Sequence, residues 1–238
     1  MKKLGVIGGL GPMATVYFLQ LITQMSEAET DQEHMEVILH SKPQIPDRTR
    51  FILGRSKEDP MPQMVEVGKG LACQGAEVIA IPCITAHYFQ QQLEEKIGIP
   101  VVNAIEETAL SLQKAGITRV GILATNGTIE SGLFRDSLIR REISFVTPSP
   151  EGQKQVMHLI YENVKAGRQV ELSRFREVSE ELFGKGAQVL LLACTELSLI
   201  KRDYPIGEGY LDVLEVLARK AVLSCGHLKN KYDCLITR

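Results

Sequence analysis

The chain has 238 residues, enough for one large domain or two small ones. Hydrophobic residues make up 44% and charged residues 24%, which is the balance of an ordinary globular protein. The net charge of −2 gives no electrostatic support for a nucleic-acid or anionic membrane partner, and no apolar run approaches the roughly 18 residues of a membrane span. We therefore expect a cytoplasmic protein that binds neither nucleic acid nor a membrane.

Short apolar runs alternate along the chain with segments whose apolar residues recur at helical spacing. We predict strands over 4–7, 36–40, 78–81, 101–102, 120–124, 144–147 and 189–193. We predict helices over 15–25, 61–74, 86–96, 105–115, 129–140, 150–166, 172–185 and 210–224. This alternation indicates an α/β fold in which helices flank parallel sheets.

Two stretches of the chain resemble each other, and both carry a cysteine after an apolar strand. Residues 75–85, GAEVIAIPCIT, match residues 186–196, GAQVLLLACTE, and this match aligns Cys83 with Cys194. Residues 4–11 and 120–127 form a second similar pair, in which a strand is followed by a turn. The repeat predicts two pseudo-symmetric flavodoxin-like lobes, over 1–103 and 104–208. We expect the last helix, within 209–225, to return to the first lobe.

Several polar or reactive residues follow the predicted strands directly. Ligands of open parallel sheets bind beyond the carboxyl ends of the strands. Gly9, Cys83, Thr125, Asn126 and Cys194 all lie just past such an end. We therefore predict one active site in the cleft between the lobes, to which each lobe contributes one cysteine.

The position of each cysteine at a turn from strand to helix predicts its chemistry. A helix N-terminus favours the thiolate, whose unperturbed pKa is about 8.5. We expect Thr85 and Thr195 to cap the two helices with their hydroxyls, and the free N–H groups there to receive a carboxylate. Two thiols that face each other suit removal of an α-proton from one face of an amino acid and protonation of the opposite face.

The cysteines also allow interpretations that involve no catalysis. Cys73, Cys225 and Cys234 are interpreted as packing or chance, and the absence of a Cys-x-x-Cys pair predicts no metal site. Cys83 and Cys194 are either small buried hydrophobes, a disulfide-exchange pair or catalytic thiols. Their matched positions in the repeat favour catalysis, and disulfide exchange does not explain the threonines beside them.

Six segments together resemble the aspartate/glutamate racemase family, and within it the aspartate racemases. They are 8–15 (GGLGPMAT), 43–49 (PQIPDRT), 82–87 (PCITAH), 123–128 (LATNGT), 160–167 (IYENVKAG) and 193–196 (ACTE). The resemblance implies an isomerase that racemises an amino acid, aspartate before glutamate, without PLP or another cofactor and usually as a homodimer. It implies Cys83 and Cys194 as the acid/base pair, with Arg48 and Lys165 as cationic contacts to the substrate carboxylates.

The remaining candidates for contact with the substrate lie in the same segments. They are Gly9, Met13, Thr85, Thr125, Asn126, Thr195 and Glu196, and no residue is assigned to a metal. Gly9 permits close approach of the backbone to a small carboxylate. Glu196 either steers the neighbouring thiol or caps its helix. His87 is interpreted as a packed or solvated side chain, with a supporting role behind the site as the alternative, and Asp47 as a residue that holds Arg48 or its loop.

Two places depart from the family pattern. The family usually carries Cys-Asn-Thr at its first cysteine, where this chain has Cys83-Ile84-Thr85. Loss of a polar contact changes specificity far more than loss of a methylene, so we expect an altered substrate or weak activity. The family also often carries Ile-Asp-Pro before the last helix. We match that segment to residues 206–209, IGEG, and expect a changed loop there.

Three other functions remain as alternatives. The spacing Gly9-x-Gly11-x-x-Ala14 fits a relaxed dinucleotide fingerprint, but the second predicted strand ends in Leu39-His40, without an acidic residue for the ribose. A racemase-like binding protein with little turnover is supported only by Ile84. A related isomerase or decarboxylase of another carboxylic acid would use the same lobes. Retention of both cysteines favours the racemase.

Overall fold

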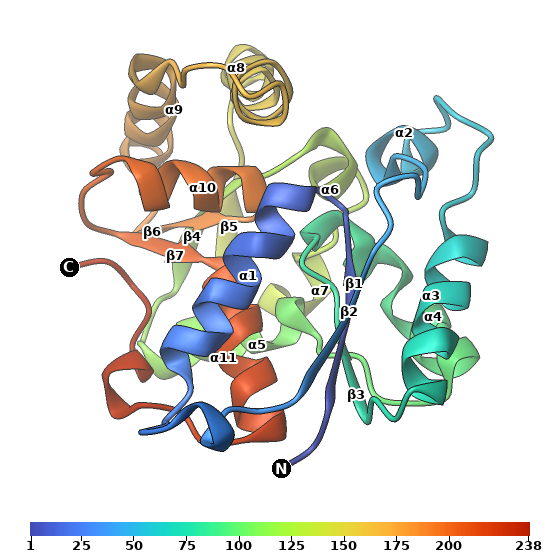
Figure 1. Cartoon of the computed structure of the whole chain (residues 1–238). Helices are drawn as coiled ribbons and strands as arrows, with labels where there is room; N and C mark the ends of the chain where they lie inside the picture. The colour runs from blue at the N-terminus through green and yellow to red at the C-terminus, as the bar shows by residue number, and fades with distance from the viewer.

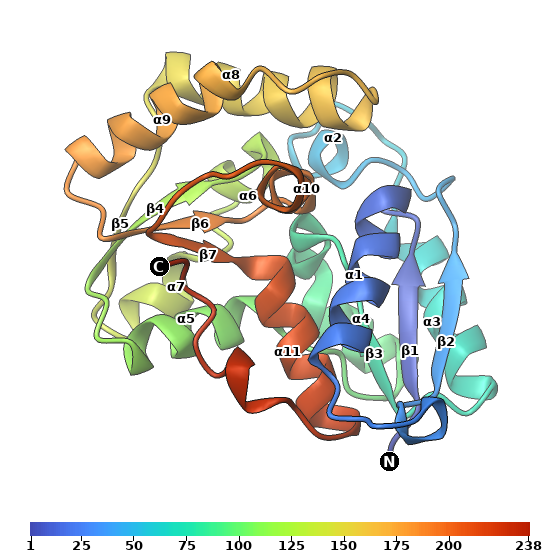
Figure 2. The same cartoon turned by 60° about the vertical axis from the view of Figure 1, so that its left-hand side comes forward.

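The computed structural model describes residues 1–238 and contains two parallel sheets (Figures 1 and 2). The first sheet has the order β2-β1-β3 and contains β1 (Leu4–Gly8), β2 (Val37–Ser41) and β3 (Val78–Ala80). The second has the order β5-β4-β6-β7 and contains β4 (Arg119–Leu123), β5 (Ser144–Val146), β6 (Val189–Leu192) and β7 (Tyr210–Asp212). Every strand pair within these sheets is parallel, so the predicted α/β fold is confirmed.

Helices surround both sheets (Figure 2). In the first part of the chain they are α1 (Pro12–Met25), α2 (Arg48–Ile52), α3 (Met61–Cys73) and α4 (Gln90–Ile97), with short 3₁₀ helices at Asp31–Glu33 and Ile84–Phe89. The rest are α5 (Ala104–Lys114), α6 (Asn126–Glu130), α7 (Arg135–Ile139), α8 (Pro150–His158), the π-helix Leu159–Lys165, α9 (Leu172–Gly184), α10 (Thr195–Asp203), α11 (Val213–Cys225) and a 3₁₀ helix at Asn230–Tyr232. None of these helices has both the length and the apolarity needed to cross a lipid bilayer.

The internal repeat places equivalent strands at equivalent positions in the two sheets. β1 pairs with β3 so that Leu4 lies opposite Val78, and β4 pairs with β6 so that Val120 lies opposite Val189. The sequence repeat matches Leu4 with Val120 and Val78 with Val189, so the two pairs share one register. β3 and β6, which lead to the two cysteines, are buried along their whole length, as expected for parallel strands covered on both faces. The strand that leads to a cysteine is therefore fixed in the same way in each sheet.

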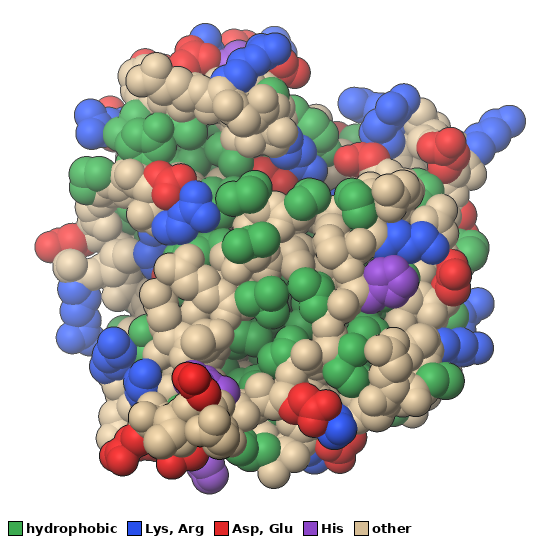
Figure 3. Space-filling view, viewed as in Figure 1, with side chains coloured by type: hydrophobic (Ala, Val, Ile, Leu, Met, Phe, Trp, Pro, Cys, Tyr) green, Lys and Arg blue, Asp and Glu red, His purple; other side chains and the backbone are tan.

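One face of the molecule carries many apolar side chains. Figure 3 shows them gathered over α1, with charged side chains mainly around the margin. Met13 and Val16 of α1 are 56% and 57% exposed, and Leu39 of the edge strand β2 is 39% exposed. Most large apolar residues of the chain are buried, so these three exposed side chains are exceptions.

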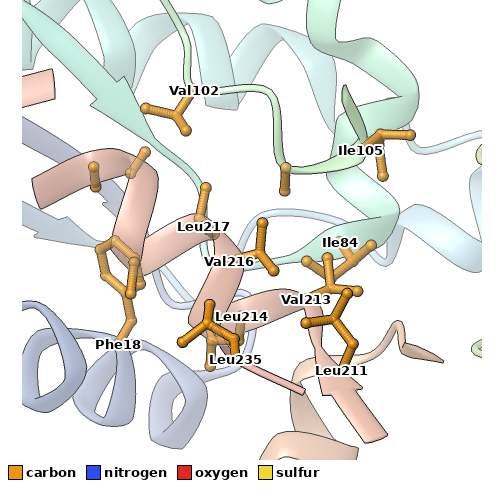
Figure 4. Packing of buried hydrophobic residues seen from close by; sticks show 14 of the residues in the cluster. Phe18, Ile84, Val102, Ile105, Leu211, Val213, Leu214, Val216, Leu217 and Leu235 are labelled. Atoms are coloured by element: carbon orange, nitrogen blue, oxygen red, sulfur yellow. The ribbon is translucent and has the colours of Figure 1, made fainter. Parts of the chain in front are cut away.

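Helix α11 joins the two halves of the molecule through one apolar core. It packs against α1 and β3 as well as against α5 and β6. Figure 4 shows Leu214 and Leu217 of α11 between Phe18 of α1 and Val102. All four residues belong to one buried cluster. That cluster also contains residues of both sheets, so the halves are not independent in their packing. The division of the lobes at residue 103 stays a prediction.

Several predicted elements have different boundaries in the structure. The helix predicted over 210–224 begins as strand β7 and becomes helical only at Val213, where Asp212 caps α11 by accepting the N–H of Leu214 at 2.8 Å. The strand predicted over 101–102 is a single bridge between Val101 and Ile79. The helix predicted over 129–140 is interrupted between α6 and α7, where Gly132 has a φ of +65°.

Residues 206–209, where a departure from the family pattern is expected, do not adjoin the last helix. Leu211 and Asp212, rather than residues 206–209, directly precede α11. Asp212 is thus the last residue before α11. Its side chain is fully buried and accepts a hydrogen bond from Ser198 Oγ at 2.7 Å in addition to the helix cap. The misplacement arose because the strand β7 was not recognised.

The role of α11 in the core predicts unequal effects of two leucine substitutions on the same helix. Leu217 is fully buried, so Leu217→Ala is expected to lower the free energy of unfolding by about 2–5 kcal/mol through the cavity that it leaves. Leu223 is 54% exposed, and Leu223→Ala is expected to cost less than about 1 kcal/mol. Denaturant unfolding of both variants measures the difference, and equal losses would contradict the packing of α11.

Candidate active site

The two cysteines of the repeat line one buried cavity. Cys83 follows β3 and is the N-cap of the 3₁₀ helix Ile84–Phe89, and Cys194 follows β6 and is the N-cap of α10. Each is only 6% exposed. The structure thus brings together two thiols from different sheets, each at the start of a helix.

The predicted capping by Thr85 and Thr195 is wrong. The cysteines themselves occupy the cap positions, and neither helix has a side-chain cap. The Thr195 hydroxyl donates to Glu196 Oε2 at 3.4 Å instead. The first N–H groups of both helices therefore have no side-chain acceptor, which leaves them suited to an anion.

The Thr85 hydroxyl belongs to a cluster of four buried threonines. It lies 3.1 Å from the hydroxyls of both Thr125 and Thr128, and Thr49 donates to Thr125 at 3.2 Å. Thr49 belongs to α2, whereas Thr125 and Thr128 follow β4. These hydrogen bonds therefore connect residues of the first sheet with residues of the second beside the cysteines.

Arg48 is held rigidly at the same cavity. Its Nη1 donates to the carbonyls of Ile45 and Pro46 at 3.2 and 2.9 Å, and its Nη2 donates to the carbonyl of Leu10 at 3.1 Å. The Nε atom is buried and has no partner. Burial lowers the pKa of Arg48, but the adjacent Cys83, together with Asp47 and Tyr161, raises it overall. Three of the five N–H groups of the guanidinium are thus taken by carbonyls, and the N–H of Nε and one N–H of Nη2 are left for an anionic ligand.

The π-helix Leu159–Lys165 supplies two further side chains. Lys165 Nζ lies 4.8 Å from the centroid of the Tyr161 ring, within the range of a cation–π contact. The Tyr161 hydroxyl donates to Asp47 Oδ2 at 3.4 Å. Burial raises the pKa of Tyr161 to about 12, so its hydroxyl stays protonated. Single-turn π-helices occur frequently at functional sites, and here the turn places residues four apart side by side.

Glu196 connects Lys165 with Cys194. Its Oε2 accepts a hydrogen bond from Cys194 Sγ at 2.9 Å, and its Oε1 lies 3.5 Å from Lys165 Nζ. Glu196 is 4% exposed. Burial and the charge of Glu196 raise the pKa of the Cys194 thiol well above its usual value, although Lys165 opposes them. At Cys194 burial and Glu196 thus oppose the preference for the thiolate that is expected at a helix N-terminus.

The charge of Lys165 is also set by this contact. Burial lowers the pKa of Lys165, but the neighbouring Glu196 and Cys194 raise it overall. Lys165 therefore stays protonated, and Glu196 has a cation beside it inside the protein. Figure 3 shows basic and acidic side chains that adjoin in the space between the α8–α9 pair and α10.

Two cavities share the residues Leu10, Asp47, Arg48, Lys165 and Glu196. The inner one, between the cysteines, has a volume of only about 10 Å³, room for about one water molecule. The outer one has a volume of about 510 Å³, within the range of small-molecule sites. A ligand as large as an amino acid can enter the inner cavity only if the side chains between the two cavities move.

Most of the predicted site residues meet at these cavities. The inner cavity is lined by Arg48, Cys83, Thr85, Thr125, Lys165, Cys194, Thr195 and Glu196, and the outer one by Gly9 and Met13. Asn126 lines neither, because its Oδ1 accepts a hydrogen bond from Gln153 at 2.8 Å, and this placement does not support its predicted substrate contact. No group of three histidine, cysteine or acidic side chains is arranged to hold a metal ion.

Sequence reasoning missed Leu10, Thr49 and Tyr161, which also line the inner cavity. All three lie inside segments that resemble the racemase family, and only this resemblance could have indicated that they line the site. Nothing in their residue types distinguishes a cavity wall from a packed core.

Two residues that follow Cys83 in the chain, Ile84 and His87, pack beside the cysteine turn. The His87 Nδ1 atom lies 3.1 Å from the Cys83 carbonyl oxygen, and burial lowers the pKa of His87, which keeps the ring neutral. Ile84 borders the inner cavity but is 2% exposed, and its side chain belongs to the large apolar cluster, near Val213 in Figure 4. His87 is therefore a packed histidine with a hydrogen bond to the cysteine turn.

Comparisons with known proteins agree on one family. Residues 7–221 match the model for Asp/Glu/Hydantoin racemase. The structure is similar to that of the aspartate racemase of Picrophilus torridus, with a TM-score of 0.80 and 32% identity over 98% of both chains. The chain is 21% identical over 225 residues to the broad specificity amino-acid racemase RacX of Bacillus subtilis, covering 92% of this chain and 96% of RacX. The glutamate racemase of Francisella tularensis shares the fold with a TM-score of 0.66 at 20% identity, covering 94% of this chain and 80% of that one.

The close packing of the first loop predicts that Gly9 tolerates no side chain. Its φ is +89°, and a Cβ atom would lie 2.7 Å from the main chain of Lys42 and Pro43. Gly54 also has a positive φ, +67°, but nothing lies within 4 Å of its added Cβ. Gly9→Ala is therefore expected to lower the free energy of unfolding by about 2 kcal/mol more than Gly54→Ala. Thermal unfolding tests this, and similar losses would show that the loop can move aside.

Proposed function

The chain belongs to the Asp/Glu/hydantoin racemase family, and we propose that it racemises an acidic amino acid, aspartate before glutamate, without a cofactor and by means of Cys83 and Cys194. Family membership implies an isomerase acting on a small amino acid. The observation that carries the proposal is the position of the two thiols, which reach one buried cavity from two different sheets.

In the proposed reaction one cysteine acts as a thiolate and removes the α-proton. The other acts as a thiol and delivers a proton to the opposite face of the same carbon, and the two exchange roles in the reverse direction. The reaction needs an acid and a base on opposite sides of the substrate. Attachment of the thiols to separate sheets supports such an arrangement, because each sheet fixes its own cysteine.

Arg48 and Lys165 are proposed to bind the carboxylates. The unpartnered Nε–H of Arg48 supplies a fixed donor, because three other N–H groups of the guanidinium are already bound to main-chain carbonyls. Lys165 is held near the cysteines by Glu196 and Tyr161. Because these cations are positioned before the substrate enters, little conformational entropy is lost on binding.

A homodimer is proposed on the family resemblance. The exposed apolar face that includes Met13, Val16 and Leu39 is a suitable surface for a second copy, since contiguous apolar patches on a monomer often mark interfaces.

The two-thiol mechanism predicts exchange of the α-hydrogen with solvent. In deuterium oxide without added cofactor, aspartate is expected to lose its α-proton NMR signal as the enantiomer forms. Cys83→Ala and Cys194→Ala are each expected to lower the rate of racemisation by at least about 1,000-fold, because each removes one of the two proton-transfer groups.

Cys73→Ala is the matched control, because Cys73 is exposed and does not line the cavity. Full turnover by either active-site variant would exclude the two-thiol mechanism. Absence of exchange with aspartate, glutamate and a panel of neutral amino acids would exclude the racemase itself. The neutral panel is included because RacX, a relative of this chain, is named for broad specificity.

Ile84 predicts how the substrate preference differs from that of relatives with asparagine at this position. Ile84→Asn is expected to change the ratio of kcat/KM between aspartate and a neutral amino acid by at least about tenfold, because an amide restores a polar contact. The same change is expected to lower the free energy of unfolding by about 1–3 kcal/mol, since it places an amide at the edge of an apolar cluster. Ile84→Val is the control. The same ratio of kcat/KM in the unmodified protein and both variants would mean that the side chain at position 84 does not affect substrate preference.

A further inference from the structure

We propose that Glu196 is a positioning residue that holds Cys194 in its thiol form, so that the resting protein has Cys194 as the proton donor and Cys83 as the base. The proposal rests on the two-thiol racemisation proposed above. It assigns different resting roles to two cysteines that the sequence repeat presents as equivalent.

The hydrogen bond between Cys194 and Glu196 carries the assignment. The sulfur and Oε2 lie 2.9 Å apart. An ionised carboxylate only accepts hydrogen bonds, so the thiol must be the donor. The other oxygen of Glu196 forms an ion pair with Lys165, whose Nζ lies 3.5 Å away. The proton therefore belongs to the sulfur.

The other groups around Cys194 do not reverse this effect. Tyr161 and Lys165 face it from the π-helix, and Cys83 faces it across the cavity. Tyr161 is neutral, and the charge of Lys165 is balanced by the carboxylate of Glu196, which lies between it and the cysteine. The group in direct contact with the thiol is thus an anion, which disfavours a second negative charge on the sulfur.

Cys83 has different neighbours. Arg48 lies beside it, and no carboxylate accepts a hydrogen bond from its thiol. Asp47 is engaged with the N–H of Arg50 and with Tyr161, and the neutral His87 contacts only the main-chain carbonyl of Cys83. A two-base racemase needs one thiolate and one thiol. With Cys194 held as the thiol, the base in the resting protein is Cys83.

The different resting roles of the two cysteines determine which protons must move during and after turnover. Cys83 accepts the α-proton as the C–H bond breaks, and Cys194 gives its own proton to the opposite face and becomes a thiolate. The product state therefore has the two roles exchanged. A proton must leave Cys83 and another must return to Cys194 before the resting form is restored. The resting form thus accepts the enantiomer whose α-hydrogen faces Cys83.

Thiol reactivity in the absence of substrate tests the assignment. Alkylation of each cysteine by iodoacetamide is measured across a pH series by peptide mass spectrometry. In the unmodified sequence Cys83 is expected to react at lower pH than Cys194, although both are equally buried. Glu196→Gln is expected to increase the alkylation rate of Cys194 near pH 7 by at least about tenfold, because loss of the negative charge stabilises the thiolate.

Asp47→Asn is the matched control. It removes one carboxylate charge from the lining of the same cavity, does not contact Cys194 and retains a good helix cap. It is expected to change Cys194 alkylation by less than about twofold. Alkylation of Cys194 ahead of Cys83 in the unmodified sequence would overturn the proposal, whether or not a variant folds. An unchanged rate of Cys194 alkylation in a folded Glu196→Gln protein would also overturn it.

The experiment also separates this proposal from the proposed function. The alkylation experiment needs no substrate. If Cys83 reacts at lower pH than Cys194 but no α-hydrogen exchange occurs, the role of Glu196 is retained and the racemase is excluded. Exchange with no difference between the thiols would support the racemase and exclude the resting asymmetry.

Discussion

The contact of Glu196 with the Lys165 ammonium and the Cys194 thiol is the interaction on which the rest of the site depends. Transfer of an isolated carboxylate or ammonium from water into a nearly dry cavity costs several kcal/mol, and an excellent partner must offset that cost. The π-helix and α10 supply the partners from segments that meet only in the folded chain. Arg48 is stabilised in the same way by three main-chain carbonyls. The cavity can therefore hold charged groups although it has room for only about one water molecule.

The fold provides the stiffness that these contacts require. Parallel strands buried on both faces fix the position of each cysteine turn, and α11 links the two sheets through a shared apolar core. In the proposed reaction each thiol must reach one face of a carbon atom, and misplacement of a reacting group by about 1 Å can lower the rate about 100-fold. The outer cavity and the nearly closed inner one indicate that movement is confined to the side chains and loops between them.

The two halves are alike in their strands and different in the residues that follow. Cys83 is followed by Ile84 and a 3₁₀ helix, whereas Cys194 is followed by Thr195, Glu196 and an α-helix. The isoleucine packs into the core, and the glutamate turns back to the thiol. A near-symmetric backbone therefore holds two chemically different cysteines. This is what a reaction needs when one group takes a proton and the other gives one.

The sequence by itself determined the α/β class, the repeat and the positions of both cysteines at strand ends, because strand periodicity and turn composition are local properties. The family segments also located Arg48 and Lys165. The short strand β7 escaped notice because its three residues run directly into the helical pattern of α11. Only the tertiary structure decided that Tyr161 reaches Asp47, 114 positions away, that Asn126 turns from the cavity and that Lys165 pairs with Glu196. The physical reason is that such contacts depend on how whole helices pack, which no local pattern of residues specifies.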